Sequence, residues 1–181
     1  MGKYIKNGLA YLRALFFKLF TVLRKGTIIG NRVRIFLSAS FDISQGGKIT
    51  IGDGAKIRER SYISVRNGAQ IILGKSSTIG MDCKVVCHEN IYIGDGTLLS
   101  PNVLIYDHDH RFNANDGVFR KEFKTSPTII GKNCWIGANT VILRGTVIED
   151  NCVIGAGCVI KGKYPAGSLI VQERIDKVTN I

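Results

Sequence analysis

IIGKNCWIGANTVILRGTVIEDNCVIGAGCVI, residues 129–160, repeats with a period of six residues. An isoleucine returns at every sixth position, and a small cysteine or threonine follows four residues after each isoleucine except the last. Helices and plain strands repeat their side chains about every 3.6 and 2 residues, so neither explains a period of six. A chain wound into short flat faces around a narrow interior does explain it, and this pattern predicts a hexapeptide-repeat β-helix. The repeating isoleucines are Ile130, Ile136, Ile142, Ile148, Ile154 and Ile160.

Weaker hexads extend this pattern back to residue 27. Successive triplets of hexads are slightly longer than three repeats, so we expect extra residues to bulge at one corner of each coil. The sequence thus predicts an all-β fold, a parallel β-helix of about six coils over residues 27–165. Residues 166–181 are expected to form a C-terminal tail.

Charge is distributed unevenly along the 181 residues. The formal net charge is +11, yet the first 41 residues contain eight Lys or Arg and no acidic residue. The remainder is close to balanced, which argues against a nucleic-acid binder that uses its whole surface and indicates one local basic element. A hydrophobic content of 45% is ample for one continuous core.

Five cysteines are present, without any C-x-x-C spacing. Four of them fall at the small inward position of the repeat, and the odd total does not suggest a disulfide framework. We therefore expect buried free thiols in a reducing cytoplasm, and no metal site.

Residues 1–26 are predicted to form a basic amphipathic helix. Arg13 and Lys18 interrupt its apolar run, which argues against a membrane span. A secretory signal is not expected either, because no small-residue cleavage site follows the apolar run. Two interpretations remain open. The helix caps the end of the coil or packs on a neighbouring subunit, or it lies on anionic lipid as an interfacial helix.

Residues 107–127, DHDHRFNANDGVFRKEFKTSP, interrupt the repeat. They are polar and out of register, and they hold two of the three histidines. A loop of about 20 residues inside a compact repeat is uncommon and usually functional.

The chain resembles the hexapeptide-repeat acyltransferases, in the branch with galactoside, maltose and polysaccharide or lipopolysaccharide O-acetyltransferases. The resemblance is carried by IGDGTLLSPNVLIYDHDH at 93–110, Pro127, and the repeat at 129–160. It implies a left-handed parallel β-helix, a homotrimer, and acetyl-CoA bound in clefts between neighbouring subunits.

Acetyl transfer to a sugar hydroxyl needs a base for the hydroxyl proton and donors for the oxyanion. A neutral imidazole titrates in the right range. The resemblance places this base at His110, with His108 as the alternative. Asp107 or Asp109 could orient the imidazole, although alternation along an extended strand predicts that both point away from the histidines.

Residues expected near the acceptor are less sharply defined. The hexad triplets that begin at Leu73 and Ile93 are 20 residues apart, so by this 20-residue step His88 could stack near His108, either as an acceptor contact or as an exposed corner. The resemblance adds Asp82 and Asn102, and Asp109 completes the predicted acceptor set.

The resemblance also implies a cofactor path along the last coils, where small residues allow the pantetheine arm to approach. Lysine or arginine should contact the phosphates of the cofactor. Arg144 replaces a proline that is usual in the turn, and the C-terminal motif also departs from the family pattern. The residues expected at the cofactor are Trp135, Ala138, Gly155, Ala156, Gly157, Lys161, Lys163, Arg174 and Lys177.

The favoured interpretation is an acetyl-CoA-dependent O-acetyltransferase acting on a saccharide, in cell-surface polysaccharide or lipopolysaccharide synthesis. Transfer to an amino sugar stays open. The expected location is the cytoplasm, with peripheral contact at the inner membrane face through residues 1–25, and no nucleic-acid partner is expected. Two alternatives are a γ-class carbonic anhydrase-like zinc enzyme using the three histidines, whose spacing differs from that family, and a non-catalytic trimeric scaffold at the membrane.

Overall fold

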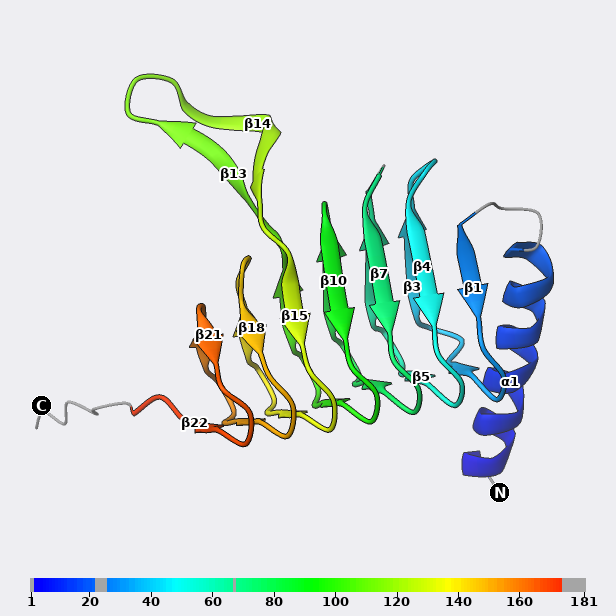
Figure 1. Cartoon of the computed structure of the whole chain (residues 1–181). Coiled ribbons are helices and arrows are strands. Elements are labelled where there is room, and N and C mark those ends of the chain that lie inside the picture. Colours follow the sequence, from blue (N-terminus) through cyan, green and yellow to red (C-terminus); the bar gives the residue numbers. More distant parts are fainter. Residues whose placement is uncertain (1, 22–25, 67, 174–181) are drawn as a thin grey trace, which may run out of the picture.

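The computed structural model describes residues 2–21, 26–66 and 68–173. One helix, α1 (Gly2–Thr21), precedes a mostly parallel β-solenoid of about six turns (Figure 1). This confirms the predicted architecture. The helix ends at Thr21, and residues 22–25 of the predicted segment lie outside the described residues.

Three parallel sheets form the sides of the solenoid. The first sheet contains β1 (Thr27–Ile29), β4 (Lys48–Ile51), β7 (Gln70–Leu73), β10 (Asn90–Ile93), β15 (Thr128–Ile130), β18 (Val147–Ile148) and β21 (Lys163–Tyr164). The second contains β2 (Arg34–Ile35), β5 (Lys56–Ile57), β8 (Thr78–Ile79), β11 (Leu98–Leu99), β16 (Trp135–Ile136), β19 (Val153–Ile154) and β22 (Leu169–Ile170). The third contains β3 (Ser40–Ile43), β6 (Tyr62–Val65), β9 (Lys84–Cys87), β12 (Leu104–Tyr106), β17 (Val141–Ile142) and β20 (Val159–Ile160).

The hexad residues fill the interior as predicted. All six repeating isoleucines of residues 130–160 are at most 1% exposed. The cysteine or threonine that follows four residues after each of the first five is at most 2% exposed. Aliphatic side chains also stack from coil to coil, because Ile35 pairs with Ile57 and Ile57 with Ile79 in register. Each such buried side chain contributes about 1.5–3 kcal/mol relative to an exposed one.

Adjacent coils approach very closely where a strand of the first sheet turns into the second. A Cβ atom added at Gly94 would lie 2.4 Å from the carbonyl oxygen of Gly131 and 2.6 Å from the amide nitrogen of Lys132. Both are backbone atoms of the next coil, so no side chain can move aside to make room. The corner therefore requires a residue without a Cβ atom.

Gly94→Ala is expected to lower the free energy of unfolding by about 2 kcal/mol, because the added methyl forces two coils apart. Gly8→Ala is the matched control, since nothing lies within 4 Å of a Cβ atom at this helical position. Alanine there should be neutral or stabilise by about 0.5–1 kcal/mol. Chemical denaturation of both variants measures the difference, and equal stabilities would contradict the close approach.

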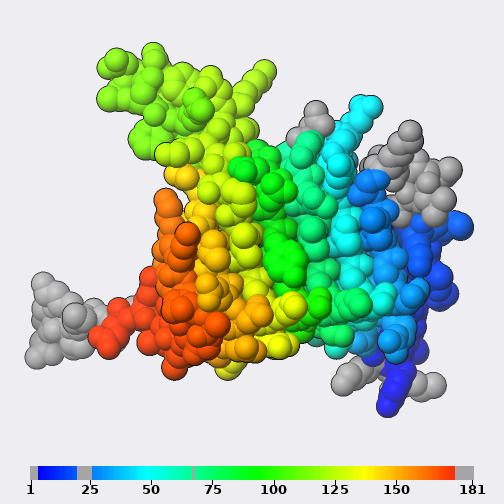
Figure 2. Space-filling model, in the orientation of Figure 1, coloured from blue at the N-terminus to red at the C-terminus, as the bar shows by residue number. Residues whose placement is uncertain are grey.

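The predicted loop is an ordered antiparallel hairpin. Strands β13 (His108–Asn113) and β14 (Gly117–Thr125) pair with each other and project from the solenoid between β12 and β15 (Figures 1 and 2). Its turn is held by Asn113, whose side-chain oxygen accepts hydrogen bonds from the N–H groups of Asn115 and Asp116. The hairpin leaves from the corner between the third and first sheets, the corner at which the earlier coils carry their extra residues.

Helix α1 covers the end of the solenoid at the first coil (Figure 1). Ala10 and Ala14 are buried there, and the ring of Phe17 packs on Phe41 with centroids 4.8 Å apart. The Arg13 guanidinium donates hydrogen bonds to carbonyl oxygens of the first coil, including that of Ala39 at 2.7 Å. Part of the predicted role, a cap on the open coil, is therefore present. Among the described residues, no helix has the length and apolarity needed to cross a membrane.

The other end of the solenoid lies further along the chain than predicted. Strand β22 pairs with β19 in the second sheet, so the coil continues past Pro165, where the sequence analysis ended it. The reason is that Leu169 and Ile170 resume the hexad after the interruption around Pro165. All five cysteines are buried free thiols, as predicted.

Candidate active site

The three histidines of the chain gather where the hairpin leaves the solenoid. His88 follows β9, and its ring stacks on that of His108 with centroids 3.7 Å apart, as the 20-residue step predicted. Phe123 of β14 contacts all three imidazoles, with centroids 4.2 Å from His88 and 4.6 Å from His110. These residues form an open cleft of about 690 Å³, lined by Ser44, Arg66, Val86, His88, His108, His110, Arg120, Lys121 and Phe123.

A fully buried carboxylate organises the base of this cleft. Asp107 is 0% exposed and accepts hydrogen bonds from the backbone N–H groups of His88 and Glu89, both at 2.8 Å. Its Oδ1 also lies 3.2 Å from Nδ1 of His108, and its Oδ2 accepts from the Cys87 thiol at 3.3 Å. The expectation that Asp107 points away from the histidines is therefore wrong. The backbone bends between β12 and β13, so strand alternation stops at this residue.

Burial and hydrogen bonding shift the pKa values of Asp107 and of the groups around it. Burial alone would raise the pKa of this carboxyl, but the hydrogen bonds from His108 and from two backbone N–H groups outweigh burial and lower it. Burial and the nearby negative charge raise the pKa of the Cys87 thiol. Burial, followed by the proximity of His108, lowers the pKa of His88 to about 4. His88 is therefore a neutral ring near pH 7.

The free energy of unfolding is expected to fall as the pH is lowered from about 6.5 to about 4. His88 binds its proton at about 4 in the folded protein, whereas an unfolded histidine binds it near its ordinary pKa of about 6.5. The unfolded state thus holds more protons in this window, and stability rises with pH. We expect His88 to account for about 1–2 kcal/mol, after discounting for its partial access to solvent.

Urea titrations of the wild type and His88→Gln at neutral pH and near the lower end of this window measure the effect. Glutamine keeps the backbone N–H that Asp107 accepts, so the variant should lose less stability on acidification. Asp107 has a lowered pKa, and its own contribution disappears only below the ordinary carboxyl range near about 4. The other charges acting on His88 come from His108, His110 and Arg66. Equal acid sensitivity of both proteins would contradict the assignment.

His110 is exposed and lies two residues along β13 from the stacked pair. Its Nδ1 lies 3.4 Å from the carbonyl oxygen of Phe119 on the facing strand. A carbonyl can only accept, so this contact requires the proton on Nδ1 and leaves the lone pair on Nε2. His110 thus offers an accessible basic nitrogen at the edge of the cleft, whereas His108 has a side chain only 12% exposed and is enclosed by rings.

Asp109, predicted near the acceptor, instead ties the hairpin to the coil. Its carboxylate forms an ion pair with Arg144, which follows β17. Arg144 is the residue that departs from the family pattern in the turn, and its side chain is only 15% exposed. The pair therefore fixes the base of the hairpin on the side away from the stacked histidines.

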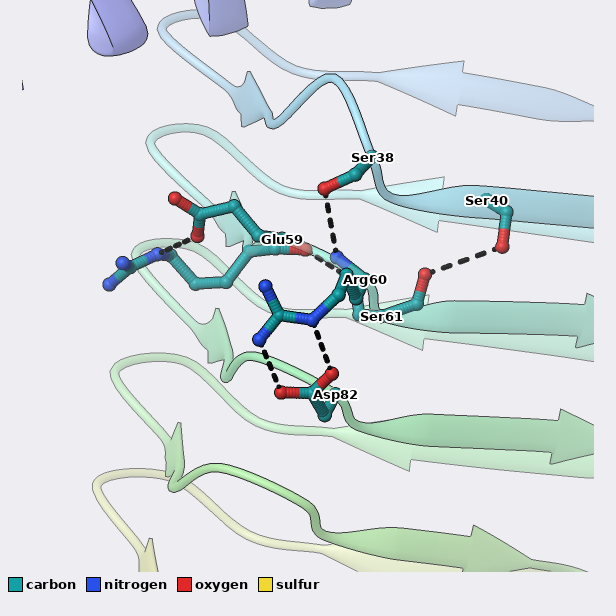
Figure 3. A network of polar contacts seen from close by, with 7 residues as sticks. Ser38, Ser40, Glu59, Arg60, Ser61 and Asp82 are labelled. Atoms are coloured by element: carbon teal, nitrogen blue, oxygen red, sulfur yellow. Dashed lines mark hydrogen bonds and ion pairs between the residues drawn. The ribbon is translucent and has the colours of Figure 1, made fainter.

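Asp82 and Asn102 lie at a different corner, between the second and third sheets. Asp82 forms a bidentate ion pair with Arg60 of the preceding coil, with both N–O distances at 2.7 Å (Figure 3). Asn102 donates a hydrogen bond to the side-chain oxygen of Asn139 at 2.7 Å. Arg60, Asp82, Asn102 and Asn139 all have positive φ, as the tight corner requires. A single chain does not bring Asp82 and Asn102 to the histidines, so their assignment to the acceptor stays a prediction.

The predicted cofactor residues lie on the second sheet, at its corner with the third sheet, and in the last coils. Trp135 is 53% exposed, and its indole N–H donates to the Ser100 hydroxyl at 2.9 Å. The N–H of Gly157 donates to the carbonyl of Ala138 at 2.7 Å, which joins two of the small residues across coils. Gly155 is half-buried, Ala156 is exposed, and both charged residues Lys161 and Lys163 are exposed. Arg174 and Lys177 lie outside the described residues.

Within residues 2–21, 26–66 and 68–173, no group of three or more His, Cys, Asp or Glu side chains is placed to hold a metal ion. The three histidines share a cleft, but two of them stack face to face.

Several site residues were missed in the sequence. Phe123, Arg66, Arg120 and Lys121 line the cleft, and none of them was singled out. A signal for Phe123 was available, because Asn115-Asp116-Gly117 is a turn sequence flanked by extended residues and predicts a hairpin. In a hairpin, the second strand, which carries Phe123, pairs with the strand that carries His108 and His110. Cys87, at the inward end of β9, could not be distinguished from the other core cysteines.

Comparison with known proteins places this geometry in context. Residues 127–161 match a family described as the hexapeptide repeat of succinyl-transferase. A probable acetyltransferase of Mycobacterium tuberculosis is 31% identical over 171 residues, covering 89% of this chain and 53% of the relative. Galactoside O-acetyltransferase of Escherichia coli is 33% identical over 98 residues, covering 53% of this chain and 46% of the relative. The chain thus spans about half the length of these curated relatives.

Among solved structures, the N-acyltransferase AntD from Bacillus cereus, in complex with dTDP and coenzyme A, matches with a TM-score of 0.73. The match covers 90% of this chain and 87% of that chain at 22% identity, and at this identity it shows the fold alone. Together with the repeat and the curated relatives, it confirms the resemblance: the chain is a hexapeptide-repeat β-solenoid protein, similar to the acetyltransferases that carry this repeat.

Proposed function

We propose that the protein transfers an acetyl group from acetyl-CoA to a hydroxyl of a saccharide, with His110 as the general base. The observation that carries the proposal is the contact of the exposed His110 ring with the Phe119 carbonyl, 3.4 Å from its Nδ1. The Phe119 carbonyl holds the proton on Nδ1, so Nε2 is free to accept a proton in the open cleft. The names of the curated relatives, which include a galactoside O-acetyltransferase, support acyl transfer to a sugar.

In this mechanism Nε2 of His110 removes the hydroxyl proton as the acceptor oxygen attacks the thioester carbonyl. The resulting imidazolium then returns the proton to the sulfur of the departing CoA thiol. Asp107 and His108 do not touch the reacting atoms in this mechanism. They brace the ring stack against which Phe123, and through it His110, is packed.

The separation of the two corners supports a site shared between subunits. The histidine cleft lies between the third and first sheets, whereas Trp135 lies on the second sheet and the small residues lie at the corner between the second and third. We propose a homotrimer in which the histidine cleft of one subunit faces the cofactor corner of its neighbour. Acetyl-CoA would run along Ala138 and residues 155–157, with Lys161 and Lys163 at its phosphates.

The charge of the cleft supports an acceptor with acidic groups. Arg66, Arg120 and Lys121 line it, and no carboxylate is among its described lining residues. Arg66 is paired with Asp42 at 3.0 Å, and Asp107 is fully buried beneath the histidines. Polysaccharide precursors activated by phosphate fit this requirement, and we propose cell-surface polysaccharide synthesis as the context. The neutral base would serve an amino sugar as well as an alcohol, so the acceptor panel must contain both.

The test is release of free thiol from acetyl-CoA by the wild-type protein with sugars, amino sugars and nucleotide sugars, alongside direct titration of acetyl-CoA binding. Turnover that depends on a hydroxyl acceptor supports the proposal. Turnover only with amino sugars would replace it by N-acetyl transfer. Absence of acetyl-CoA binding would contradict it, and zinc analysis of the same sample would then test the carbonic anhydrase alternative.

A further inference from the structure

Helix α1 uses two opposite faces. The face toward the solenoid consists of small residues, Ala10 and Ala14, with Phe17 and Arg13 beside them. At 3.6 residues per turn, the large apolar residues of the helix fall on the other side. The cap on the coil and the apolar face are thus separate features of one helix, and each can be occupied without disturbing the other.

The outward face is apolar and open. Its residues recur at helical spacing, and their exposed fractions range from 41% for Leu9 to 72% for Leu19. A contiguous apolar strip of this kind on a protein surface marks an interaction site. In Figure 2 the helix forms one end of the molecule. The strip consists of Ile5, Leu9, Leu12, Phe16 and Leu19.

Positive charge borders the strip. Lys6 lies on one flank of the helix and Lys18 on the other, whereas the Arg13 guanidinium is bound to carbonyl oxygens of the first coil. No acidic residue occurs before Asp42 in the chain. The acid of the coil that Lys6 influences, Glu59, already forms an ion pair with Arg58 at 2.9 Å. The end of the molecule at α1 therefore presents an apolar strip inside a basic border.

We infer that this face of α1 lies in the surface of an anionic phospholipid membrane. An apolar helix face with lysine and arginine at its edges is the composition of interfacial helices, which sink the apolar side below the headgroups. Basic residues near an anionic surface add electrostatic attraction to this burial. A second protein surface would need acidic groups to match the border, and the described surface around α1 is itself basic. The anionic lipid is therefore the occupant that both features fit.

This placement determines how the molecule stands on the membrane. Because α1 lies across the end of the solenoid, the coils rise away from the lipid, and the β13–β14 hairpin leans away from the helix (Figure 1). The histidine cleft then opens to the side, above the surface. The inference concerns location and is independent of the chemistry proposed for the cleft.

The experiment is co-sedimentation of the full chain with vesicles of phosphatidylcholine alone and of phosphatidylcholine with phosphatidylglycerol. The test variant is Leu12→Glu with Leu19→Glu, two exposed positions that leave the capping face unchanged. The matched control is Phe112→Glu with Val118→Glu on the hairpin, which introduces the same charge at two exposed apolar residues. Circular dichroism and thermal unfolding verify that all three proteins are equally folded.

We expect the wild type and the control to bind the anionic vesicles, with weaker binding in high salt and little binding to phosphatidylcholine alone. The helix variant should bind at least tenfold more weakly. Equal binding by the helix variant would overturn the inference, as would a wild type that does not bind anionic vesicles at all. A change in oligomeric mass of the helix variant, with no vesicle binding by the wild type, would assign the face to a second copy of the chain instead. Salt-insensitive binding to both vesicle types would overturn the anionic part of the proposal.

Discussion

His110→Ala is expected to lower kcat for acetyl transfer by about 10²–10⁴-fold while acetyl-CoA binding stays unchanged. The substitution removes the one exposed imidazole of the cleft whose basic nitrogen is defined by a backbone contact. An acceptor hydroxyl must then lose its proton to water, which is a far weaker base held in no fixed position. Because the side chain is exposed and makes one long hydrogen bond, the fold should tolerate its removal. Thiol release and calorimetric titration of acetyl-CoA measure the two expectations.

His108→Ala provides the comparison, because both substitutions remove an imidazole two residues apart on β13. Loss of His108 opens the ring stack on His88 and removes one of the two donors to Oδ1 of Asp107, so a reduced thermal stability is expected together with a smaller loss of kcat. A large loss in His108→Ala with near wild-type turnover in His110→Ala would assign the base to His108. Turnover that survives both substitutions would contradict the mechanism.

The solenoid could be predicted from the sequence because one physical constraint repeats. Each coil must place a branched aliphatic and a small residue at fixed positions of a narrow interior, so the pattern is visible at Ile136 and Cys152 without any long-range information. Stacking of His88 on His108 followed from the same repeat, since residues one coil apart share a corner. Local spacing was therefore sufficient wherever the chain stays in register.

Prediction was less successful where the chain leaves the register. Strand alternation placed Asp107 outward, but the bend before β13 turns it inward, where four donors converge on it. The hairpin was taken as a loop although Gly117, with φ of +71°, closes a turn of a recognisable type. The ion pair of Asp109 with Arg144 joins residues 35 apart in sequence, and the hexad spacing does not predict such a pair. These features depend on how the corner folds in three dimensions.

The cap and the apolar face of α1 illustrate a different limit. A capping helix and an interfacial helix are alternatives at the level of sequence, because hydrophobic periodicity shows only that apolar residues share a side. In the structure Ala10, Ala14 and Phe17 face the coil, and Arg13 donates hydrogen bonds to it. The larger side chains, such as Leu12, are left outward. Which side of an amphipathic helix meets the protein could not be read from its periodicity.

Asp107→Asn is expected to lower the free energy of unfolding by about 3–5 kcal/mol. The carboxylate accepts from two backbone N–H groups, an imidazole and a thiol in a fully buried position. Asparagine has nearly the same shape but offers one acceptor oxygen and turns an NH₂ group toward donors. At most one of the N–H groups of His88 and Glu89 can then keep its partner, and the other is left buried and unsatisfied, at a cost of about 1–3 kcal/mol in addition to the lost charge-assisted bonds.

Asp109→Asn is the matched control, because it makes the same change two residues away on an exposed side chain. The Asp109 carboxylate is 47% exposed, and asparagine keeps an oxygen that can accept from Arg144, so a loss of about 1 kcal/mol is expected. Urea denaturation at neutral pH compares the two variants. If Asp107→Asn is stable enough to assay, its kcat should also fall, because His108 loses the carboxylate that holds its ring against Phe123, on which His110 packs. Equal stability of the two variants would mean that the buried carboxylate does not hold the cleft together, and the hydrogen bonds from His88 and Glu89 would then have to be satisfied in another way.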